Sequence, residues 1–358
     1  MMRSPLSRII GRTLATLALL ACTGSAHGRT LYVATTGLDS AACGAKTSAC
    51  RSIGQAVNAL AADGDTIVVG PGRYGDLDGS GTLGDSPGEE TGGFGCVLLI
   101  GRAVTLLSSD GAAATVIDGR NLQMDCNVGM PVDATQLGKP GKGFTVTNTY
   151  SQDSTAIIAT AADLAIRGNQ LVPTGYNPQG PGLGIQITDT AQGTVVEANQ
   201  LTGFATAIYV LGANATVTQN QISQSGYGIL LANSGTVRGN VITGCYQGIH
   251  IVDSGPATVT GNSIYGNQDA IFISDPFLAT ITKNNIAGSN LCGVRNGDKY
   301  SAGKVGAVVA NNYWGAATGP GPDPADTVEA PSCTYFNSTT TATPFATKPF
   351  KVKAPIRP

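Results

Sequence analysis

The sequence predicts an all-β solenoid, a single-stranded parallel β-helix with an N-terminal capping helix. The main observation is an asparagine that returns about every 20 residues through the second half of the chain. It follows a β-type dipeptide and precedes an apolar residue, as in TVRGNVI at 236–242 and TVTGNSI at 258–264. The asparagines assigned to this ladder are Asn169, Asn199, Asn220, Asn240, Asn262, Asn284 and Asn311.

A second phrase keeps the same interval and consists of a small residue, an isoleucine, a variable residue and an apolar residue. Examples are GIHI at 248–251 and AIFI at 270–273. Two short strands and a tight asparagine turn in each period indicate one solenoid coil. The composition agrees, because 49 glycines and only 12% charged residues favour strands and turns.

The N-terminal residues 1–28 read as a secretion signal. Arg3, Arg8 and Arg12 precede an apolar stretch at 13–21 that is too short to span a bilayer. Cleavage after Ala26 or Gly28 is one expectation. The alternative is a lipobox, Leu-Leu-Ala-Cys at 19–22, which would leave a lipid anchor on Cys22. Both alternatives predict a secreted, periplasmic or cell-surface protein, and no later segment is a transmembrane candidate.

Residues 29–333 are expected to form the β-helix domain. Its first strand lies at 31–33, and Ser52 and Gln55 form a Ser-x-x-Gln capping box at the start of a helix. This helix would cover the bare apolar end of the first coil. The rhythm breaks at 75–95, 120–142, 172–183 and 287–305, which we expect to emerge as side loops. Residues 334–358, rich in Pro and Lys, are expected to form a separate tail.

Several motifs resemble one known group of proteins. They are the opening YVxxxG at 32–37, DGDTIVVGPGRY at 63–74, and NNYWG at 311–315 followed by Gly-Pro at 319–320. In these motifs the chain resembles secreted bacterial right-handed parallel β-helix proteins of the pectin-lyase-like superfamily. The resemblance implies the fold and a role in polysaccharide binding or processing. It implies no single reaction, because that superfamily includes lyases, hydrolases, epimerases and adhesins.

Seven cysteines follow the signal, and pairing is expected in an exported protein. We predict the pairs Cys43–Cys50, Cys96–Cys126 and Cys292–Cys333, with Cys245 buried and free. Sequence cannot prove connectivity, so these pairs are hypotheses. The net charge of −2 becomes more negative once the three signal arginines are removed, which argues against nucleic acid as a partner.

The loop at 76–83 matches the first half of an EF-hand calcium loop. Candidate ligands are Asp76, Asp78, Ser80 and Asp85, and Glu89 or Glu90 could reach back in place of Asp85. Position 12 of the motif is Pro87 rather than a glutamate, and no helices flank the loop, so a simple acidic loop is the alternative. No other cofactor is predicted, and His250, the one histidine after the signal, excludes a multi-histidine zinc site.

His250 also stands in a predicted outward column of the coils, a flat aromatic strip on which sugar rings stack. That column reads Gln186, Tyr209, Leu230, His250, Phe272 and Arg295. A neighbouring outward column reads Glu197, Thr218, Arg238, Thr260 and Thr282. We take His250, Arg238 and Tyr209 as catalytic candidates and Gln186, Glu197 and Phe272 as substrate-binding candidates. The alternatives are that a loop or the tail covers the aromatic strip, that His250 is structural, and that the second column is solvated surface.

Enzyme signatures of the superfamily were sought directly. The chain contains no Asp-Asp pair, no Gly-His-Gly and no Asp-Pro-His-Asp. Two functions therefore stand open: a polysaccharide lyase or glycoside hydrolase, and a non-catalytic surface-structural or adhesion protein.

Overall fold

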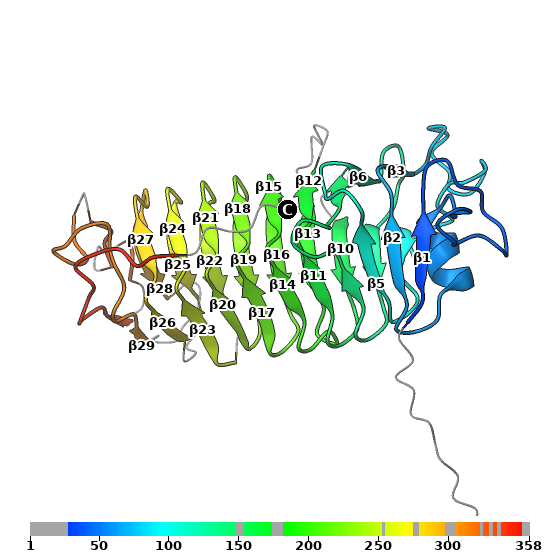
Figure 1. The fold of residues 1–358 in the computed structure, drawn as a ribbon. Coiled ribbons are helices and arrows are strands. Elements are labelled where there is room, and N and C mark those ends of the chain that lie inside the picture. Colours follow the sequence, from blue (N-terminus) through cyan, green and yellow to red (C-terminus); the bar gives the residue numbers. More distant parts are fainter. Residues whose placement is uncertain are drawn as a thin grey trace, which may run out of the picture.

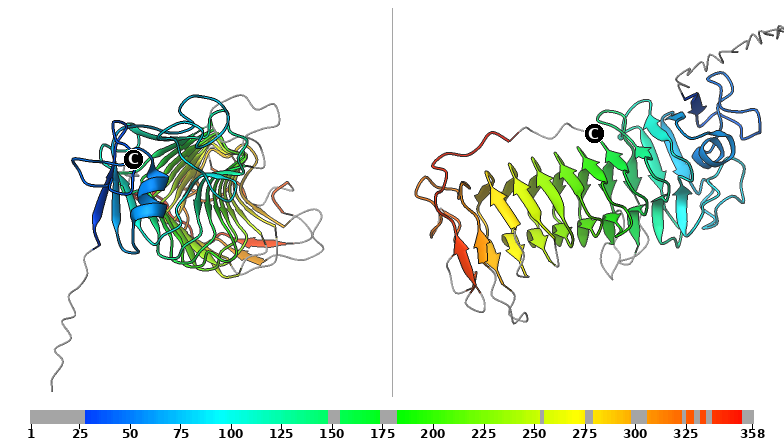
Figure 2. Two further views of the ribbon diagram at one scale, coloured as in Figure 1. Left: turned by 90° about the vertical axis from the view of Figure 1, so that its right-hand side faces the viewer. Right: turned by 90° about the horizontal axis from the view of Figure 1, so that it is seen from below.

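In the computed structural model the chain forms an elongated parallel β-helix (Figure 1). The structure describes residues 28–147, 154–173, 182–252, 255–274, 279–297, 306–322, 325–328, 332–334 and 338–352. Three parallel sheets enclose one continuous apolar core, as the view along the axis shows (Figure 2). The predicted all-β, right-handed parallel β-helix is confirmed.

Sheet 1 holds twelve strands. In spatial order they are β1 (Thr30–Val33), β2 (Thr66–Val69), β5 (Thr105–Ser108), β8 (Gln136–Leu137), β11 (Ala165–Arg167), β14 (Val195–Glu197), β17 (Ala215–Thr218), β20 (Gly235–Arg238), β23 (Ala257–Thr260), β26 (Ala279–Thr282), β29 (Gly306–Val308) and β30 (Thr339–Thr341).

Sheets 2 and 3 hold nine strands each. Sheet 2 consists of β3 (Gly72–Gly75), β6 (Thr115–Asp118), β9 (Thr145–Thr147), β12 (Gln170–Val172), β15 (Gln200–Thr202), β18 (Gln221–Ser223), β21 (Val241–Thr243), β24 (Ser263–Tyr265) and β27 (Asn285–Ala287). Sheet 3 consists of β4 (Cys96–Leu99), β7 (Cys126–Met130), β10 (Thr155–Ala159), β13 (Leu183–Ile187), β16 (Thr206–Val210), β19 (Tyr227–Leu231), β22 (Gln247–Ile251), β25 (Asp269–Ile273) and β28 (Cys292–Asn296).

The alternation of each strand fixes which side chains enter the core. In sheet 1 the middle residue of the Thr-Val-x phrase is fully buried, as at Val237 and Val259, and its register partner in the next coil is buried as well. The flanking residues point outward, so Thr236 and Arg238 lie on the outer surface. The predicted inward and outward columns of sheet 1 are therefore correct.

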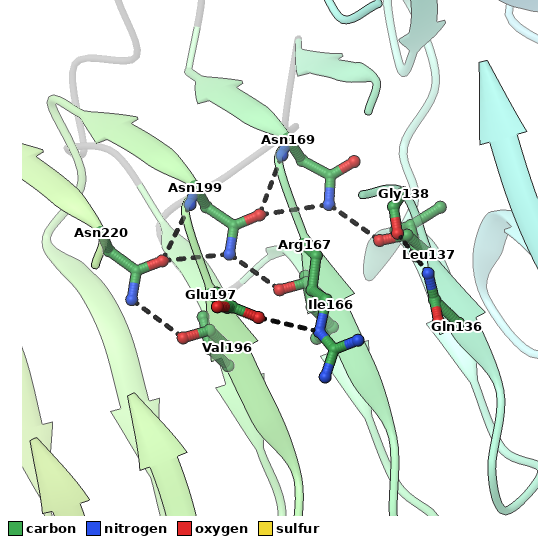
Figure 3. A network of polar contacts seen from close by, with 10 residues as sticks. All are labelled: Gln136, Leu137, Gly138, Ile166, Arg167, Asn169, Val196, Glu197, Asn199 and Asn220. Atoms are coloured by element: carbon green, nitrogen blue, oxygen red, sulfur yellow. Dashed lines mark hydrogen bonds and ion pairs between the residues drawn. The ribbon is translucent and has the colours of Figure 1, made fainter. Parts of the chain in front are cut away.

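The asparagine ladder stands at the corner between sheets 1 and 2 (Figure 3). Asn199 Oδ1 accepts from the backbone N–H of Asn169 at 2.9 Å, and Asn199 Nδ2 donates to the carbonyl of Ile166 in the preceding coil. Asn220 repeats the same bonds one coil further on. Each buried turn N–H thus finds an acceptor in the next coil, which is the requirement for burying a turn.

The same pattern continues through Asn240, Asn262 and Asn284. The last member is Asn312, whose Oδ1 accepts from the Asn284 N–H at 2.8 Å. The assignment of Asn311 to the ladder was therefore wrong by one residue. Asn311 instead holds a left-handed turn conformation, with φ of 60°.

The predicted capping helix is present, and its last residues form the short helix η1 (Gln55–Leu60). Ser52 Oγ accepts from the Gln55 N–H, which is one half of the predicted capping box. The other half is absent, because the Gln55 side chain donates to the Ser40 carbonyl instead. The carboxylate of Glu90 replaces it and accepts from Ile53 N–H and Gly54 N–H, both at 2.7 Å.

Three predicted boundaries need correction. The stretch 120–142 is not a side loop, because β7 and β8 lie within it and pair with neighbouring coils, and β28 likewise lies within 287–305. The tail does not begin at 334, because β30 pairs with β29 as the last strand of sheet 1. The segment then turns back along the outside of the solenoid (Figure 2), where Phe350 exchanges backbone hydrogen bonds with the Asn285 side chain on sheet 2.

The three predicted disulfides are present: Cys43–Cys50, Cys96–Cys126 and Cys292–Cys333. Cys245 is free and buried, as predicted. The signal segment and Cys22 lie outside the described residues, as do most of the predicted loop 172–183 and the last six residues of the tail. Within the described chain, no helix has the length and apolar character needed to cross a bilayer.

Candidate functional site

The outward column of sheet 3 forms one continuous strip along the solenoid, which we call the sheet 3 strip. Strand register pairs Gln186 with Tyr209, Tyr209 with Leu230, and Leu230 with His250. It continues from His250 through Phe272 to Arg295, as the sequence predicts. Neighbouring coils are about 4.8 Å apart, so each member of the strip stands directly over the next.

At its C-terminal part the strip is an aromatic stack. The His250 ring lies 4.6 Å from the Phe272 ring and 5.5 Å from the Tyr227 ring, with interplanar angles of 23° and 29°. The Arg295 guanidinium sits over the other side of Phe272, 5.6 Å from its centroid. Tyr227 was missed by the sequence argument because it opens β19, three residues before the predicted column.

Two polar contacts orient this stack. His250 Nε2 lies 3.0 Å from the Ser274 hydroxyl. Arg295 Nη2 lies 3.1 Å from a carboxylate oxygen of Asp269, whose side chain is fully buried. Burial raises the pKa of Asp269 to about 6, although the positive charge of Arg295 lowers it. The ion pair with Asp269 thereby fixes the position of the Arg295 guanidinium beside the aromatic rings.

Two predicted site residues are not brought to this strip. Arg238 and Glu197 lie on β20 and β14 of sheet 1, whose outer face is separate from that of sheet 3. Glu197 forms an ion pair with Arg167 of the preceding coil at 3.2 Å (Figure 3). The catalytic trio of His250, Tyr209 and Arg238 is therefore divided between two sheets.

The predicted metal loop brings three carboxylates together. Oxygens of Asp76, Asp78 and Glu89 lie within 4.8 Å of one another, so Glu89, rather than Asp85, completes the triplet. Asp85 instead accepts from the Ser80 hydroxyl at 2.9 Å. Asp76 accepts from Gly79 N–H and Gly81 N–H.

Backbone hydrogen bonds keep this acidic loop ionised. Desolvation acts to raise the pKa of Glu89, but N–H groups of Leu77, Ser86 and Asp78 overcome it and lower the pKa. The hydroxyl of Ser86 lowers the pKa of Asp78 in the same way. The loop therefore carries concentrated negative charge at neutral pH.

Soft metal donors are scattered in the part of the chain that the structure describes. His250 is the one histidine there and faces outward, whereas Cys245 is buried in the core, where burial raises its thiol pKa to about 11. Met130 is also fully buried. The described residues include two clusters of acidic or thiol side chains. Neither cluster includes His250, and one contains the disulfide Cys43–Cys50.

Comparison with solved structures supports the fold. The chain is similar to the structure of XylC in complex with xylose, with a TM-score of 0.55, 12% identity, and coverage of 79% of this chain and 69% of that one. It is also similar to a rhamnogalacturonan lyase, with a TM-score of 0.46, 11% identity, and coverage of 89% and 87%. A third similar structure is the GH136 lacto-N-biosidase from Eubacterium ramulus, with a TM-score of 0.43, 11% identity, and coverage of 80% and 61%.

Sequence comparison identifies a family rather than a single relative. No curated protein matches the chain. A family model described as "Periplasmic copper-binding protein (NosD)" matches residues 133–319, from the β7–β8 connection to the Gly-Pro motif after Trp314. That family description and the three disulfides agree with a location outside the cytoplasm. Because the match spans more than half of the 358 residues, the chain belongs to the NosD family of periplasmic β-helix proteins.

Proposed function

We propose that this protein binds an extended polysaccharide along the sheet 3 strip and does not cleave it. The observation that carries the proposal is the aligned array of Tyr209, Tyr227, His250 and Arg295 on one outer face. The Tyr209 ring and the edges of the stacked Tyr227 and His250 rings lie at coil spacing along this face, where they can contact successive sugar units of a chain.

The described part of the tail leaves this strip uncovered. Phe350 is bonded to Asn285 on β27 of sheet 2, and β30 joins sheet 1. Tyr209, Tyr227 and His250 are each only partly buried. Their rings are therefore accessible to a ligand that approaches sheet 3 from outside.

Binding without cleavage is favoured by the placement of charged groups. Glycoside hydrolysis needs two carboxyl groups that flank the scissile bond. Among the described residues of the sheet 3 strands, Asp269 is the one acidic residue, and its side chain is buried against Arg295. Lyase chemistry needs a base beside a cation that neutralises the uronate, but Arg238 lies on sheet 1, and Arg295 on the strip is already paired with the Asp269 carboxylate.

Copper does not fit the donor set. The family description implies copper, which favours imidazole, thiolate and thioether ligands. In the described chain His250 faces outward, Cys245 and Met130 are buried in the core, and Met124 lies partly exposed before β7, so these donors do not converge. We therefore assign no step of the proposed function to copper.

Tyr209 provides the test of binding. Tyr209→Ala is expected to weaken retention on a polysaccharide affinity gel about 5- to 10-fold, because it removes an aromatic face worth roughly 1 kcal/mol beyond its buried area. Tyr265→Ala is the matched control, because Tyr265 is an exposed tyrosine on sheet 2. A panel of neutral and acidic polysaccharides would identify the polymer.

Product formation separates binding from catalysis. The same incubations should yield neither new reducing ends nor the absorbance of unsaturated products. Ends alone would identify a hydrolase, and ends with absorbance would identify a lyase. Equal retention of Tyr209→Ala and Tyr265→Ala would contradict binding on the sheet 3 strip.

We also propose that the loop at 76–90 binds calcium. Three carboxyl groups whose oxygens lie within 4.8 Å of one another repel when they are charged, and a hard divalent cation relieves that repulsion. About 1 mM Ca²⁺ should raise Tm by roughly 2–4 °C, as expected for a site of about 10⁻⁴ M affinity. Asp78→Asn should abolish the shift, and Mg²⁺ should not reproduce it. An unchanged Tm at about 10 mM Ca²⁺ would mean that the loop is closed by its own hydrogen bonds.

Export itself remains part of the proposal. The signal at 1–28 is expected to be removed after Ala26 or Gly28, with acylation of Cys22 as the alternative. The intact mass of the protein recovered from its native compartment distinguishes a free N-terminus at residue 27 or 29 from a lipidated Cys22.

A further inference from the structure

The sheet 3 strip changes character at its N-terminal end. Register extends the column from Gln186 back through Ile158, Gly129 and Leu99. Polar and aromatic residues thus give way to aliphatic ones. Gly129 stands between Leu99 and Ile158, and it leaves a gap in the column where every neighbour has a side chain.

This gap opens into a cavity of about 430 Å³. Its lining includes Phe94, Leu99, Gly129, Pro131, Ile158 and Thr160. A Cβ at Gly129 would lie 2.8 Å from Cys96 Sγ and 3.1 Å from a methyl of Leu99, so a larger residue would intrude on the cavity wall. The volume and apolar lining are typical of a small-molecule site.

Phe94 stands at the rim of this cavity in an unfavourable state. Its side chain is 91% exposed, and its φ is 47°. Phe94 and Gly95, which has φ of 75°, are the central residues of a two-residue turn closed by reciprocal hydrogen bonds between Gly93 and Cys96. Positive φ at both positions defines a type I′ turn, which favours Asn, Asp or Gly at the position of Phe94.

Neither packing nor backbone preference explains a phenylalanine there. An exposed aromatic ring gains little from burial, and a positive φ costs a non-glycine residue on the order of 1 kcal/mol. The Cys96–Cys126 disulfide anchors the turn to the next coil. The result is an aromatic ring presented from a short, covalently anchored turn, a combination that indicates a ligand contact.

We propose that this cavity is a terminal subsite that takes a neutral 6-deoxyhexose residue of the bound polysaccharide. The proposal rests on the proposed function, because the cavity is the end of the sheet 3 strip. The C–H face of the sugar would stack on Phe94, and its C6 methyl group would contact Leu99 and Ile158. The cavity admits a whole monosaccharide rather than a small substituent alone. Among the described residues that line it there is no Lys or Arg to attract a uronate, and Asp125 is the one charged side chain.

Matched sugar pairs test the specificity. Binding of methyl fucoside against methyl galactoside, and of methyl rhamnoside against methyl mannoside, should be measured by saturation-transfer NMR and calorimetry. The members of each pair differ only in the hydroxyl on C6. The deoxy sugar should bind about 10-fold more tightly, because a C6 hydroxyl placed against Leu99 and Ile158, rather than against Asp125 or Thr160, would be buried among apolar side chains.

The variant Phe94→Asn separates binding from folding. Asparagine suits the type I′ turn, so Tm should stay equal or rise while deoxy-sugar binding falls about 10-fold. Leu38→Ala is the control, because Leu38 is also an exposed apolar residue but lies before the capping helix. Equal binding within each sugar pair, tighter binding of a 6-O-acetyl sugar, or unchanged binding by Phe94→Asn would overturn the proposal.

Failure of the two proposals can be told apart. Polymer retention that depends on Tyr209, without any preference for deoxy sugars, would reject the terminal subsite and leave strip binding intact. Deoxy-sugar binding that depends on Phe94, with polymer retention indifferent to Tyr209, would reject the strip and leave the cavity as an isolated sugar site.

Discussion

Replacing Asn240 with alanine is expected to lower the free energy of unfolding by about 2–4 kcal/mol. Asn240 is fully buried. Its Oδ1 accepts from the Asn220 N–H at 2.9 Å, and its Nδ2 donates to the Val217 carbonyl at 3.0 Å. The alanine variant leaves both backbone groups buried without a partner, and each such group costs about 1–3 kcal/mol.

The Asn240→Ala variant should unfold locally, around the altered coil, under milder conditions than those that unfold the whole solenoid. Each coil of a solenoid contacts only its neighbours, so a break in the ladder weakens one junction between coils. We expect limited proteolysis of Asn240→Ala to cut near this junction at temperatures where the parent protein resists. Urea unfolding monitored by circular dichroism gives the accompanying free energy.

Gln221→Ala is the matched control for this prediction. Gln221 carries the same amide group, immediately follows ladder residue Asn220, and is exposed on sheet 2. Its replacement should change stability by no more than about 0.5 kcal/mol. Similar losses in the two variants would show that the ladder amide contributes no more than a surface amide.

The fold was predictable because a solenoid repeats the same local pattern of strands and turns in every coil. Once the interval of Asn220, Asn240 and Asn262 is known, strand alternation assigns the inward valines and the outward columns of every coil. The column from Gln186 to Arg295 follows from this register alone. The disulfide pairs followed as well, because each joins cysteines that flank a short loop or an excursion between coils.

The wrong predictions lie where the spacing or the apolar pattern of the repeat changes. The last gap in the ladder, 28 residues from Asn284 to Asn312, is longer than the gaps of 20 to 22 residues between Asn199 and Asn284, so Asn311 and Asn312 were equally compatible with the pattern. The left-handed turn at Asn311 turns the side chain of Asn312 into the ladder. Strand β7 escaped prediction because Asn127 and Gly129 interrupt its apolar pattern, although neighbouring coils on both sides impose the pairing.

Contacts between distant parts of the sequence were not predictable from local patterns. The pairing of Glu197 with Arg167 joins two coils on the outer face of sheet 1. Tyr227 lies on β19 and His250 on the neighbouring β22. The Tyr227 ring extends toward the His250 ring and so joins the aromatic stack. Such reach depends on side-chain direction and local space, which a repeat pattern does not contain.

Among these contacts between distant parts of the sequence, the one made by Glu90 is expected to contribute most to stability. It lies in the first long insertion, and its carboxylate caps a helix 36 to 37 residues earlier in the sequence. Glu90→Ala leaves the Ile53 and Gly54 N–H groups buried without acceptors. We expect a loss of about 2–4 kcal/mol near pH 5. Glu197→Ala, which breaks a partly exposed ion pair, should cost no more than about 1 kcal/mol.

The cost of this substitution should depend on pH in a defined direction. Burial raises the pKa of Glu90 to about 7, although the N–H groups of Ile53 and Gly54 lower it. A raised pKa means that the folded protein binds the proton more tightly than the unfolded chain. The stability that this provides is complete below the unfolded pKa of 4.5 and is lost as pH rises through about 7.

The difference between the parent protein and Glu90→Ala should therefore shrink by about 3 kcal/mol between about pH 4.5 and pH 8. Asp269 also titrates in this window, with a pKa of about 6, but it is present in both proteins and cancels in the difference. Urea unfolding of both proteins at several pH values measures the trend. A difference that grows with pH would mean that the two backbone hydrogen bonds outweigh burial and keep Glu90 ionised in the folded state, so that the cap acts as a charged clamp on the helix.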